Sequence, residues 1–219
     1  GCLNDSRFIQ FIKHFPKKIE NINLSYNQLH HLNEDVWFTL QHSFLNHVMS
    51  IDLSSNFLGK MPYDAFERLI QCLPKNLINL DLSQNHMSSW KGTDFNYALS
   101  HLPVSLESLN LSDNNLHHLT SSMIGELFLS LPKRLNHLDL SLNEFVNPHD
   151  FGWVSAFMHL PSELKSIMLK ETIFKLIPEC IVKLLMGELP KSLKTMDLSN
   201  NNLSNGIHAY SPASLKLYL

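Results

Sequence analysis

The chain has 219 residues, of which 44% are hydrophobic and 17% are charged, and its formal charge at pH 7 is −3. This apolar content is sufficient for a continuous core, while the scattered lysines and arginines argue against binding to nucleic acid or to a membrane. The sequence contains no apolar run of about 18 residues that would span a bilayer, and its start shows no signal-peptide pattern.

The amino-terminal segment is predicted to be a helix. Its apolar residues have the spacing of one buried helical face, namely Phe8, Phe11, Ile12 and Phe15. Asp5 or Ser6 is the candidate helix N-cap. We expect residues 1–18 to form a half-repeat that caps the structure.

A pattern of apolar residues then recurs every 29 residues. Its first positions are Ile19, Val48, Leu77, Leu106, Leu135, Leu164 and Leu193, so residues 19–203 contain seven repeats. In the third repeat, Leu77, Leu80 and Leu82 are predicted to point inward from a short strand, while Asp81 and Ser83 point outward. The fixed interval predicts a stack of identical structural units, that is, a solenoid.

An asparagine ends the predicted strand in six of the repeats. These residues are Asn27, Asn56, Asn85, Asn114, Asn143 and Asn201. An asparagine amide can donate and accept hydrogen bonds at once, so stacked copies are expected to form a ladder that satisfies backbone groups buried in the turns.

The second half of each repeat has the apolar spacing of a helix. The stripe consists of Phe66, Leu69, Ile70 and Leu73, then Phe95, Ala98, Leu99 and Leu102, then Ile124, Leu127, Phe128 and Leu131, then Trp153, Ala156, Phe157 and Leu160. A proline follows the stripe at Pro74, Pro103, Pro132, Pro161 and Pro190. Proline cannot continue a helix, so it is expected to turn the chain into the next strand.

The 29-residue frame fails after Asn201. We expect residues 204–219 to form an irregular last repeat, with a short strand that contains Leu215 and either Leu217 or Tyr218.

The strand, turn and helix unit resembles the leucine-rich repeat family, in particular the long repeats of ribonuclease inhibitor. The resemblance implies an α/β fold, a right-handed horseshoe solenoid with a parallel sheet on the concave face and helices on the convex face, in one domain of residues 1–219. The residue pattern from Leu102-Pro103 to Ser105-Leu106 is also similar to the repeats of leucine-rich repeat effectors that intracellular bacteria such as Legionella inject into host cells.

The three cysteines indicate a reducing compartment. Cys2, Cys72 and Cys180 are odd in number and far apart in the sequence, whereas extracellular repeat proteins usually close their ends with paired cysteines. We expect these thiols to be buried or half-buried, and we expect the protein to act inside a cell.

One outward row of the predicted sheet is rich in carboxylates. It consists of Asn23, Asp52, Asp81, Asn110, Asp139, Met168 and Asp197. Two interpretations remain open: these residues are small, solvated members of the repeat pattern, or their carboxylates form a negative stripe that attracts a basic partner.

The sixth repeat breaks the pattern and is the favoured partner-binding patch. Met168, Lys170 and Glu171 replace the usual outward residues there, and Thr172 replaces the ladder asparagine. In the fifth repeat, His137 and Leu142 also depart from small polar residues. Interfaces concentrate binding energy in such long or apolar side chains, whereas simple decay of the repeat is the competing interpretation.

No catalytic or metal-binding motif is found. His30-His31 and His117-His118 occupy equivalent positions three repeats apart, too far to share an ion, and no cysteine or carboxylate stands beside them at a ligand spacing. We therefore expect no cofactor, no metal site and no enzymatic activity.

The sequence thus predicts a protein-binding module that uses its concave face and is a monomer in isolation. The main hypothesis is an effector or adaptor that captures another protein, acting in the cytosol of a host cell. One alternative is a stoichiometric inhibitor that covers the active site of a host enzyme or of another effector. Another is an enzyme whose catalytic domain lies outside this chain.

Overall fold

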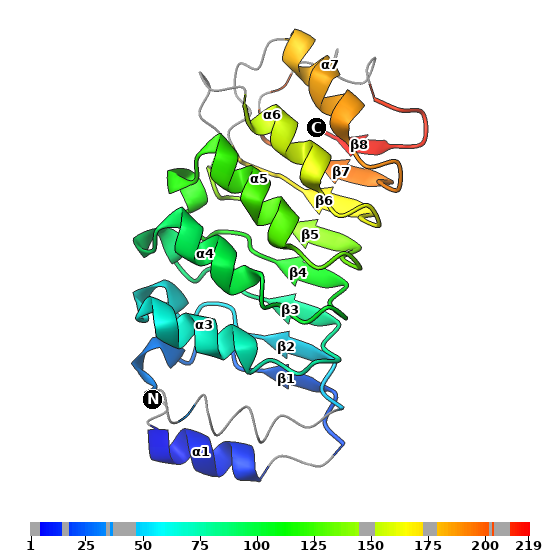
Figure 1. Ribbon diagram of the computed structural model, residues 1–219. Helices are drawn as coiled ribbons and strands as arrows, with labels where there is room; N and C mark the ends of the chain where they lie inside the picture. The colour runs from blue at the N-terminus through cyan, green and yellow to red at the C-terminus, as the bar shows by residue number, and fades with distance from the viewer. Residues whose placement is uncertain are drawn as a thin grey trace.

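The computed structural model describes residues 5–14, 18–33, 36, 47–144, 152–172, 179–201, 203 and 211–219. Its strands form one open parallel sheet of eight members, stacked in the order in which they occur along the chain (Figure 1). They are β1 (Asn21–Asn23), β2 (Ser50–Asp52), β3 (Asn79–Asp81), β4 (Ser108–Asn110), β5 (His137–Asp139), β6 (Ser166–Met168), β7 (Thr195–Asp197) and β8 (Lys216–Tyr218). The predicted α/β solenoid is confirmed.

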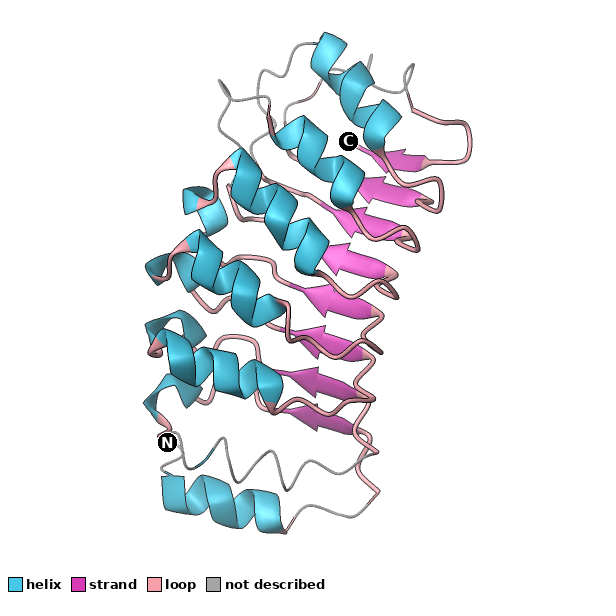
Figure 2. Cartoon of the chain, in the orientation of Figure 1, coloured by secondary structure: helices cyan, strands magenta, loops and turns pink. Residues whose placement is uncertain are grey.

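The helices line the side of the solenoid opposite the strands (Figure 2). They are α1 (Asp5–Lys13), α3 (Tyr63–Gln71), α4 (Gly92–Leu99), α5 (Ser121–Ser130), α6 (Trp153–Ala156) and α7 (Glu179–Glu188). Short 3-10 helices complete the units: η1 (Leu29–His31), η2 (Leu58–Lys60), η3 (Met87–Ser89), η4 (Leu116–His118) and η5 (Phe157–His159). The other face of the sheet is left without a covering helix in the described part of the chain.

The core lies between the sheet and the helices. The predicted helical stripe is confirmed, since each of its residues in the second to fifth repeats is at most 5% exposed. The middle residue of each strand from β1 to β7 is also buried, as Leu80, Leu109 and Leu138 illustrate. The sequence period and the packing therefore have one cause, which is the burial of one face of every element.

The prolines after the helices build a repeated turn. The carbonyl oxygen of Pro74 accepts a hydrogen bond from the backbone N–H of Leu77, at 3.0 Å. The same bond recurs at Pro103, Pro132, Pro161, Pro190 and Pro212. The five prolines from Pro74 to Pro190 thus follow the ends of helices, and all six turn the chain into the next strand of the sheet.

The two ends depart from the regular unit. At the amino end, Phe8 is fully buried, whereas the side chains of Phe11, Ile12 and Phe15 lie outside the described residues. Asp5 is already the first helical residue, so the prediction of Asp5 or Ser6 as the N-cap is wrong. The carboxylate of Asp5 instead accepts from the backbone N–H of Asn33, at 3.1 Å.

At the carboxyl end, Met196 of β7 pairs with Leu217 of β8, so the last unit is shorter than the others. Leu215 is buried but lies one residue before β8, so the prediction that the strand contains Leu215 is wrong, and both Leu217 and Tyr218 belong to it. The predicted divisions at residues 1–18, 19–203 and 204–219 stay predictions, because parts of both boundaries lie outside the described residues.

Asn114 shows how the ladder asparagines connect the repeats. Its Oδ1 accepts from the backbone N–H of Asn85 in the preceding repeat, at 2.8 Å. Its Nδ2 donates to the carbonyl oxygens of Leu111 and Ser112 in its own repeat, at 2.9 and 3.3 Å, and of Leu82 in the preceding repeat, at 2.9 Å. One side chain thereby satisfies several backbone groups that water cannot reach.

The other asparagines of the series make equivalent bonds. Donation from Nδ2 to nearby carbonyl oxygens recurs at Asn27, Asn56, Asn85, Asn143 and Asn201. Four of these five, all but Asn27, are at most 1% exposed. In the sixth repeat, Thr172 is buried and its Oγ1 donates to the carbonyl oxygen of Leu169, at 2.7 Å.

The residues beside the ladder asparagines have left-handed backbone conformations. Positive φ angles occur on the amino side at Tyr26, Ser55, Gln84, Asp113, Leu142, Glu171 and Asn200, and on the carboxyl side at Gln28, Phe57, His86, Asn115 and Glu144. A residue with a Cβ in this conformation costs roughly 1–2 kcal/mol relative to the right-handed region. The ladder must therefore be strong enough to hold strained backbone on both sides.

Replacing Asn114 with alanine should lower the free energy of unfolding by about 2–4 kcal/mol, because several buried backbone groups lose their partners. Chemical denaturation monitored by circular dichroism measures the change. The exposed residue Lys133 provides the control, and Lys133→Ala should leave stability nearly unchanged. Equal effects of the two substitutions would contradict the role given to the ladder.

Candidate functional site

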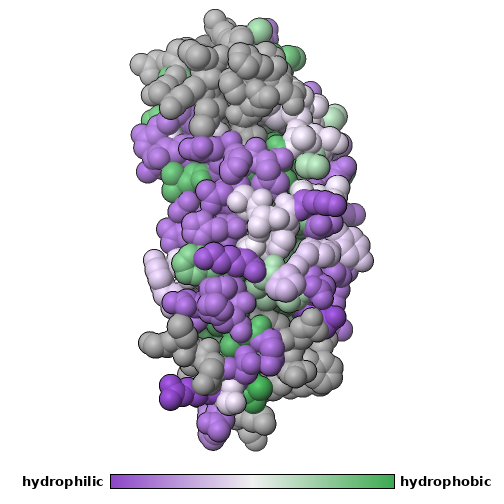
Figure 3. Space-filling view, turned by 90° about the vertical axis from the view of Figure 1, so that its left-hand side faces the viewer, coloured by the Kyte–Doolittle hydropathy of each residue, from purple (hydrophilic) through white to green (hydrophobic). Residues whose placement is uncertain are grey.

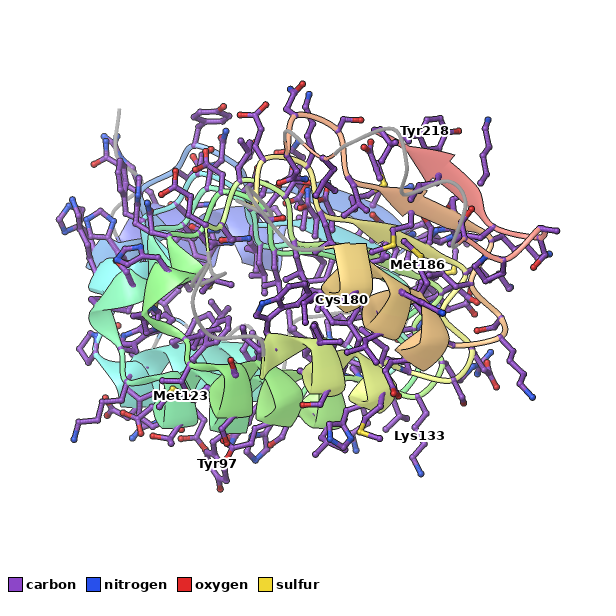
Figure 4. All side chains as sticks on the ribbon, turned by 90° about the horizontal axis from the view of Figure 1, so that it is seen from above. Tyr97, Met123, Lys133, Cys180, Met186 and Tyr218 are labelled. Atoms are coloured by element: carbon purple, nitrogen blue, oxygen red, sulfur yellow. The ribbon has the colours of Figure 1, made fainter. Side chains whose placement is uncertain are left out.

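The exposed side of the sheet, here called the sheet face, presents the first and third residues of every strand. The strand register brings the third residues into one row across the solenoid: Asn23, Asp52, Asp81, Asn110, Asp139, Met168, Asp197 and Tyr218. Tyr218 extends from the strand side of the molecule, whereas Tyr97 extends from the helix side (Figure 4). The acidic residues predicted as a row therefore do lie on neighbouring strands.

Each aspartate or asparagine of this row also closes the turn after its strand. The Oδ1 atom of Asp81 accepts from the backbone N–H of Ser83 at 2.8 Å, and the Ser83 hydroxyl donates to the same atom at 2.6 Å. The backbone bond recurs at Asn23, Asp52, Asn110, Asp139 and Asp197. These are the side-chain turns that aspartate and asparagine favour, and they explain much of the row without any partner.

Our sequence interpretation missed this bond. The signal was present, because an aspartate or asparagine is followed by Leu-Ser in every repeat except the sixth. The role of the pattern depends on which atom of the carboxylate faces the backbone, and composition alone does not give that orientation.

The second carboxylate oxygen still contributes a negative charge to the sheet face. In two cases a neighbouring asparagine bonds to it: Asn23 donates to Oδ2 of Asp52 at 2.9 Å, and Asn110 donates to Oδ2 of Asp81 at 3.0 Å. The amide groups are neutral, so the charge remains. The turn bond and the negative stripe are therefore compatible, and the two interpretations of the row do not exclude each other.

A shallow depression of about 490 Å³ lies on the sheet face across β2 to β6. Among the residues predicted as binding residues, it is lined by Asp52, Asp81, Asn110, His137, Asp139 and Met168. Lys170, Glu171, Leu142 and Asp197 do not line it. The depression thus brings together the acidic row and the first part of the sixth-repeat patch.

The sixth repeat replaces the regular turn bond with another. Met168 has no side-chain oxygen to accept from the backbone two residues later. The N–H of Lys170 instead donates to the hydroxyl of Ser141 in the preceding repeat, at 3.2 Å. This leaves the Met168 side chain partly exposed on the sheet face, beside Asp139 and Asp197 in the register.

Leu142 and Glu171 lie at the edge of the sheet face, in the turns. Both have positive φ angles, of 61° and 53°. Leu142 is 42% exposed despite being apolar. Glu171 is exposed and accepts from Nδ2 of Asn200, at 2.8 Å. The predicted patch is thus divided between the sheet face and the turn edge beside it.

The remaining polar clusters offer no metal site in the described part of the chain. No group of three or more histidine, cysteine or acidic side chains there could hold an ion. His30 and His31 lie in η1, and His117 and His118 lie in η4. Cys72 is buried, as predicted, whereas Cys180 is exposed, so the prediction of a buried or half-buried thiol is wrong there; Cys2 lies outside the described residues.

None of the described helices is both long enough and apolar enough to pass through a bilayer. The face that Figure 3 turns toward the viewer is mostly hydrophilic, and its apolar residues appear separately between polar ones. The exposed large apolar side chains of the helices, Tyr97, Leu129, Met158 and Leu184, come from different elements.

Comparison with known proteins assigns the repeat. A model of the family described as Leucine Rich Repeat matches residues 105–127 and 192–215. The solved structure of the leucine-rich repeat-containing protein LegL7 from Legionella pneumophila superposes with a TM-score of 0.76 at 25% sequence identity over 93% of this chain. These findings support a leucine-rich repeat fold for the chain. Members of this family are typically protein-binding scaffolds without catalytic activity.

This leucine-rich repeat chain spans 63% of the length of the LegL7 chain. A search of curated protein sequences gives no significant match. The similarity to a Legionella protein is consistent with the repeat style noted in the sequence.

Exchanging Asp81 for asparagine should lower the free energy of unfolding by no more than about 0.5 kcal/mol, because Asn23 and Asn110 show that an amide oxygen accepts the same turn bond. The bond that is lost, from Asn110 to Oδ2, is only partly buried. Asp81→Ala should lower it by about 1 kcal/mol, since the N–H of Ser83 loses its acceptor. Urea denaturation of both variants measures the difference. A loss as large in Asp81→Asn as in Asp81→Ala would show that the charge, and not the turn bond, provides the stability.

His118 should make the leucine-rich repeat protein less stable in mild acid. Burial lowers the pKa of His118 below its usual value of 6.5, and the opposing influence of the nearby Asn115 backbone is smaller. Protons therefore bind more readily to the unfolded chain, so the stabilisation is complete above pH 6.5 and is lost as the pH falls from there through the lowered pKa.

Melting temperatures at about pH 7.5 and pH 5.5 test this effect, because the two values lie on either side of the usual histidine pKa. His118→Gln should reduce the decrease in melting temperature between them. The same substitution at His159, which is exposed on the helix side, is the control. An unchanged decrease in the His118 variant would contradict the assignment.

Proposed function

We propose that this leucine-rich repeat protein captures another protein with its sheet face, as an effector or adaptor that acts inside a host cell. The observation that carries the proposal is the sixth repeat. In the other repeats a turn bond accounts for the aspartate or asparagine of the third strand position, whereas Met168 makes no such bond and remains partly exposed.

Several features of the sheet face support a protein partner. The depression of about 490 Å³ is open and lined by polar side chains around Met168, unlike the enclosed apolar pockets that hold small ligands. Lys170 is exposed directly after β6 and adds a long, charged side chain beside it. A partly exposed apolar residue surrounded by polar ones has the arrangement of an interface hot spot.

The host-cell setting is supported by the similarity to LegL7 of Legionella pneumophila and by the repeat style. The prediction of a reducing compartment from the cysteines agrees with this setting, since the described Cys72 and Cys180 form no disulfide. We propose that the protein needs no catalytic group or cofactor of its own to carry out this role.

Capture of a partner from host-cell lysate, followed by mass spectrometry, tests the proposal. Met168→Glu combined with Lys170→Glu should weaken binding of the captured protein by about tenfold or more, because hot-spot residues contribute about 2 kcal/mol each. Met158→Glu combined with Lys133→Glu is the matched control, since these residues are exposed on the helix side. Equal binding by both double variants would place the interface elsewhere.

The acidic row is tested separately. Asp52→Asn combined with Asp81→Asn removes two charges and retains the turn bonds, so weaker binding of this variant would assign the negative stripe a role in recognition. A captured enzyme whose turnover falls when the protein is added in stoichiometric amount would identify the protein as an inhibitor.

A further inference from the structure

A lysine lies at the start of each of the last three strands. Lys165 and Lys194 directly precede β6 and β7, whereas Lys216 is the first residue of β8 and pairs with Thr195 in the register. The backbone N–H of Lys194 donates to the carbonyl oxygen of Lys165 at 2.8 Å, and the N–H of Lys216 donates to that of Lys194 at 2.7 Å. Neighbouring strands are about 4.8 Å apart, so Lys165 and Lys194 lie side by side along the solenoid axis, and Lys216 lies one strand further on, displaced by one residue in the register. All three are exposed, and so is Lys170 at the other end of β6. We call these four residues the lysine line.

The lysine line has little neutralising charge near it. None of its members takes part in a salt bridge within the described residues, where the pairs found are Arg68 with Asp64 and Arg134 with Glu107. Two carboxylates do lie nearby: Asp197, in β7, keeps its negative charge while it accepts from the N–H and the hydroxyl of Ser199, and the exposed Glu171 follows Lys170. The four lysines therefore outnumber these two carboxylates.

Two side chains add apolar surface beside the lysines. Met168 and Tyr218 flank Asp197 in the register of β6 to β8, and Tyr218 is 42% exposed. The Nζ of Lys216 lies 4.7 Å from the centre of the Tyr218 ring. This end of the sheet face thus combines cationic and apolar groups.

The charge changes sign between β5 and β6. Over β1 to β5, the outward strand positions and the residue before each strand include five carboxylates and neither lysine nor arginine. The five are Glu20, Asp52, Asp81, Glu107 and Asp139. Glu107 is partly neutralised by Arg134, at 3.4 Å, whereas the others have no such partner among the described residues. The sheet face is therefore negative over its first five strands and positive over its last three.

We propose that the sheet face binds a helix of a partner protein whose acidic end lies over β6 to β8 and whose basic end lies over β2 to β5. This inference rests on the proposed function and adds the chemistry and the direction of the partner. The apolar side of the helix would contact Met168 and Tyr218.

Spacing favours a helix over an extended segment. Side chains three or four positions apart on a helix are about 5–6 Å apart, close to the separation of the lysine-bearing strands. Side chains on one face of an extended segment are about 6.7 Å apart. Their spacing therefore departs from the separation of the strands after one or two positions. A helix lying along the solenoid axis can therefore present carboxylates to the equivalent residues Lys165 and Lys194, with Lys216 one strand further along its path.

The carboxylates disfavour a uniform polyanion. Nucleic acid, polyphosphate or an anionic membrane would meet the lysine line and the five carboxylates on the same face, and the carboxylates would repel it. A partner with both signs of charge in separate blocks avoids this conflict.

Two synthetic helical peptides of identical composition test the inference. In one, glutamates fill one half and lysines the other; in the second, the same residues alternate so that charge is mixed along the helix. Fluorescence anisotropy with the whole chain should show about tenfold tighter binding of the block peptide. The difference should decrease as NaCl is raised from about 0.05 M to about 0.5 M, because salt screens exposed charges.

Charge reversal assigns the effect to the lysines. Lys165→Glu combined with Lys194→Glu should remove the preference for the block peptide. Lys91→Glu combined with Lys133→Glu changes the net charge equally at exposed sites away from the sheet face and should leave the preference intact. Circular dichroism confirms that each variant is folded.

The inference is wrong if the mixed peptide binds as tightly as the block peptide, if the block peptide shows no binding, or if the reversal of Lys165 and Lys194 has no effect. It is also wrong if inorganic polyphosphate or vesicles that contain phosphatidylserine bind more tightly than the block peptide. The outcomes for the proposed function are separate. If the Met168 and Lys170 variant loses the captured partner while the Lys165 and Lys194 variant retains it, protein capture stands and the charge arrangement does not govern it.

Discussion

The asparagine ladder is the interaction on which the rest of the structure depends. A solenoid turn buries backbone groups at one side of every repeat, and those groups have no helix or strand partner. Asn114 and its equivalents serve carbonyl and N–H groups of two repeats at once. The left-handed residues on both sides of the asparagines from Asn27 to Asn143 are tolerated because these bonds fix the turn.

Because the ladder fixes the turns, the outward-facing residues of the strands contribute little to the stability of the fold. The aspartates of the row make one structural bond, in which Oδ1 accepts from the backbone N–H of the serine two residues later. This bond leaves the second carboxylate oxygen available. Asn110 makes the same bond with its amide oxygen, so the fold requires an oxygen acceptor at this position and does not require a charge. The distribution of aspartate and asparagine along the row can therefore vary without loss of the fold, and it sets the electrostatic character of the face.

Much of the fold could be predicted because the period reports burial directly. The positions of Leu80 and Phe95 in the frame were sufficient to predict a buried strand residue and a buried helix residue. Features that depend on backbone angles or on atom orientation could not be predicted. The positive φ of Leu142, the start of α1 at Asp5 and the turn bond of Asp81 belong to this class. The candidate site was predicted only as a set of outward positions, and the change in charge along the sheet required the register of β6 to β8.

The substitution of Thr172 in the ladder has a mechanical consequence. Each ladder asparagine from Asn56 onward bonds to the repeat before it, whereas Thr172 donates to Leu169 in its own repeat, and no side-chain bond from it to the fifth repeat is seen among the described residues. Repeat proteins unfold as linear arrays in which each interface contributes its own cooperativity. The junction between β5 and β6 therefore lacks the side-chain bond to the preceding repeat that the ladder asparagines make, and the bond from the N–H of Lys170 to the Ser141 hydroxyl crosses it instead. The change in charge and the break in the ladder fall at this same junction. A partner bound across it would contact both parts of the solenoid and hold them together.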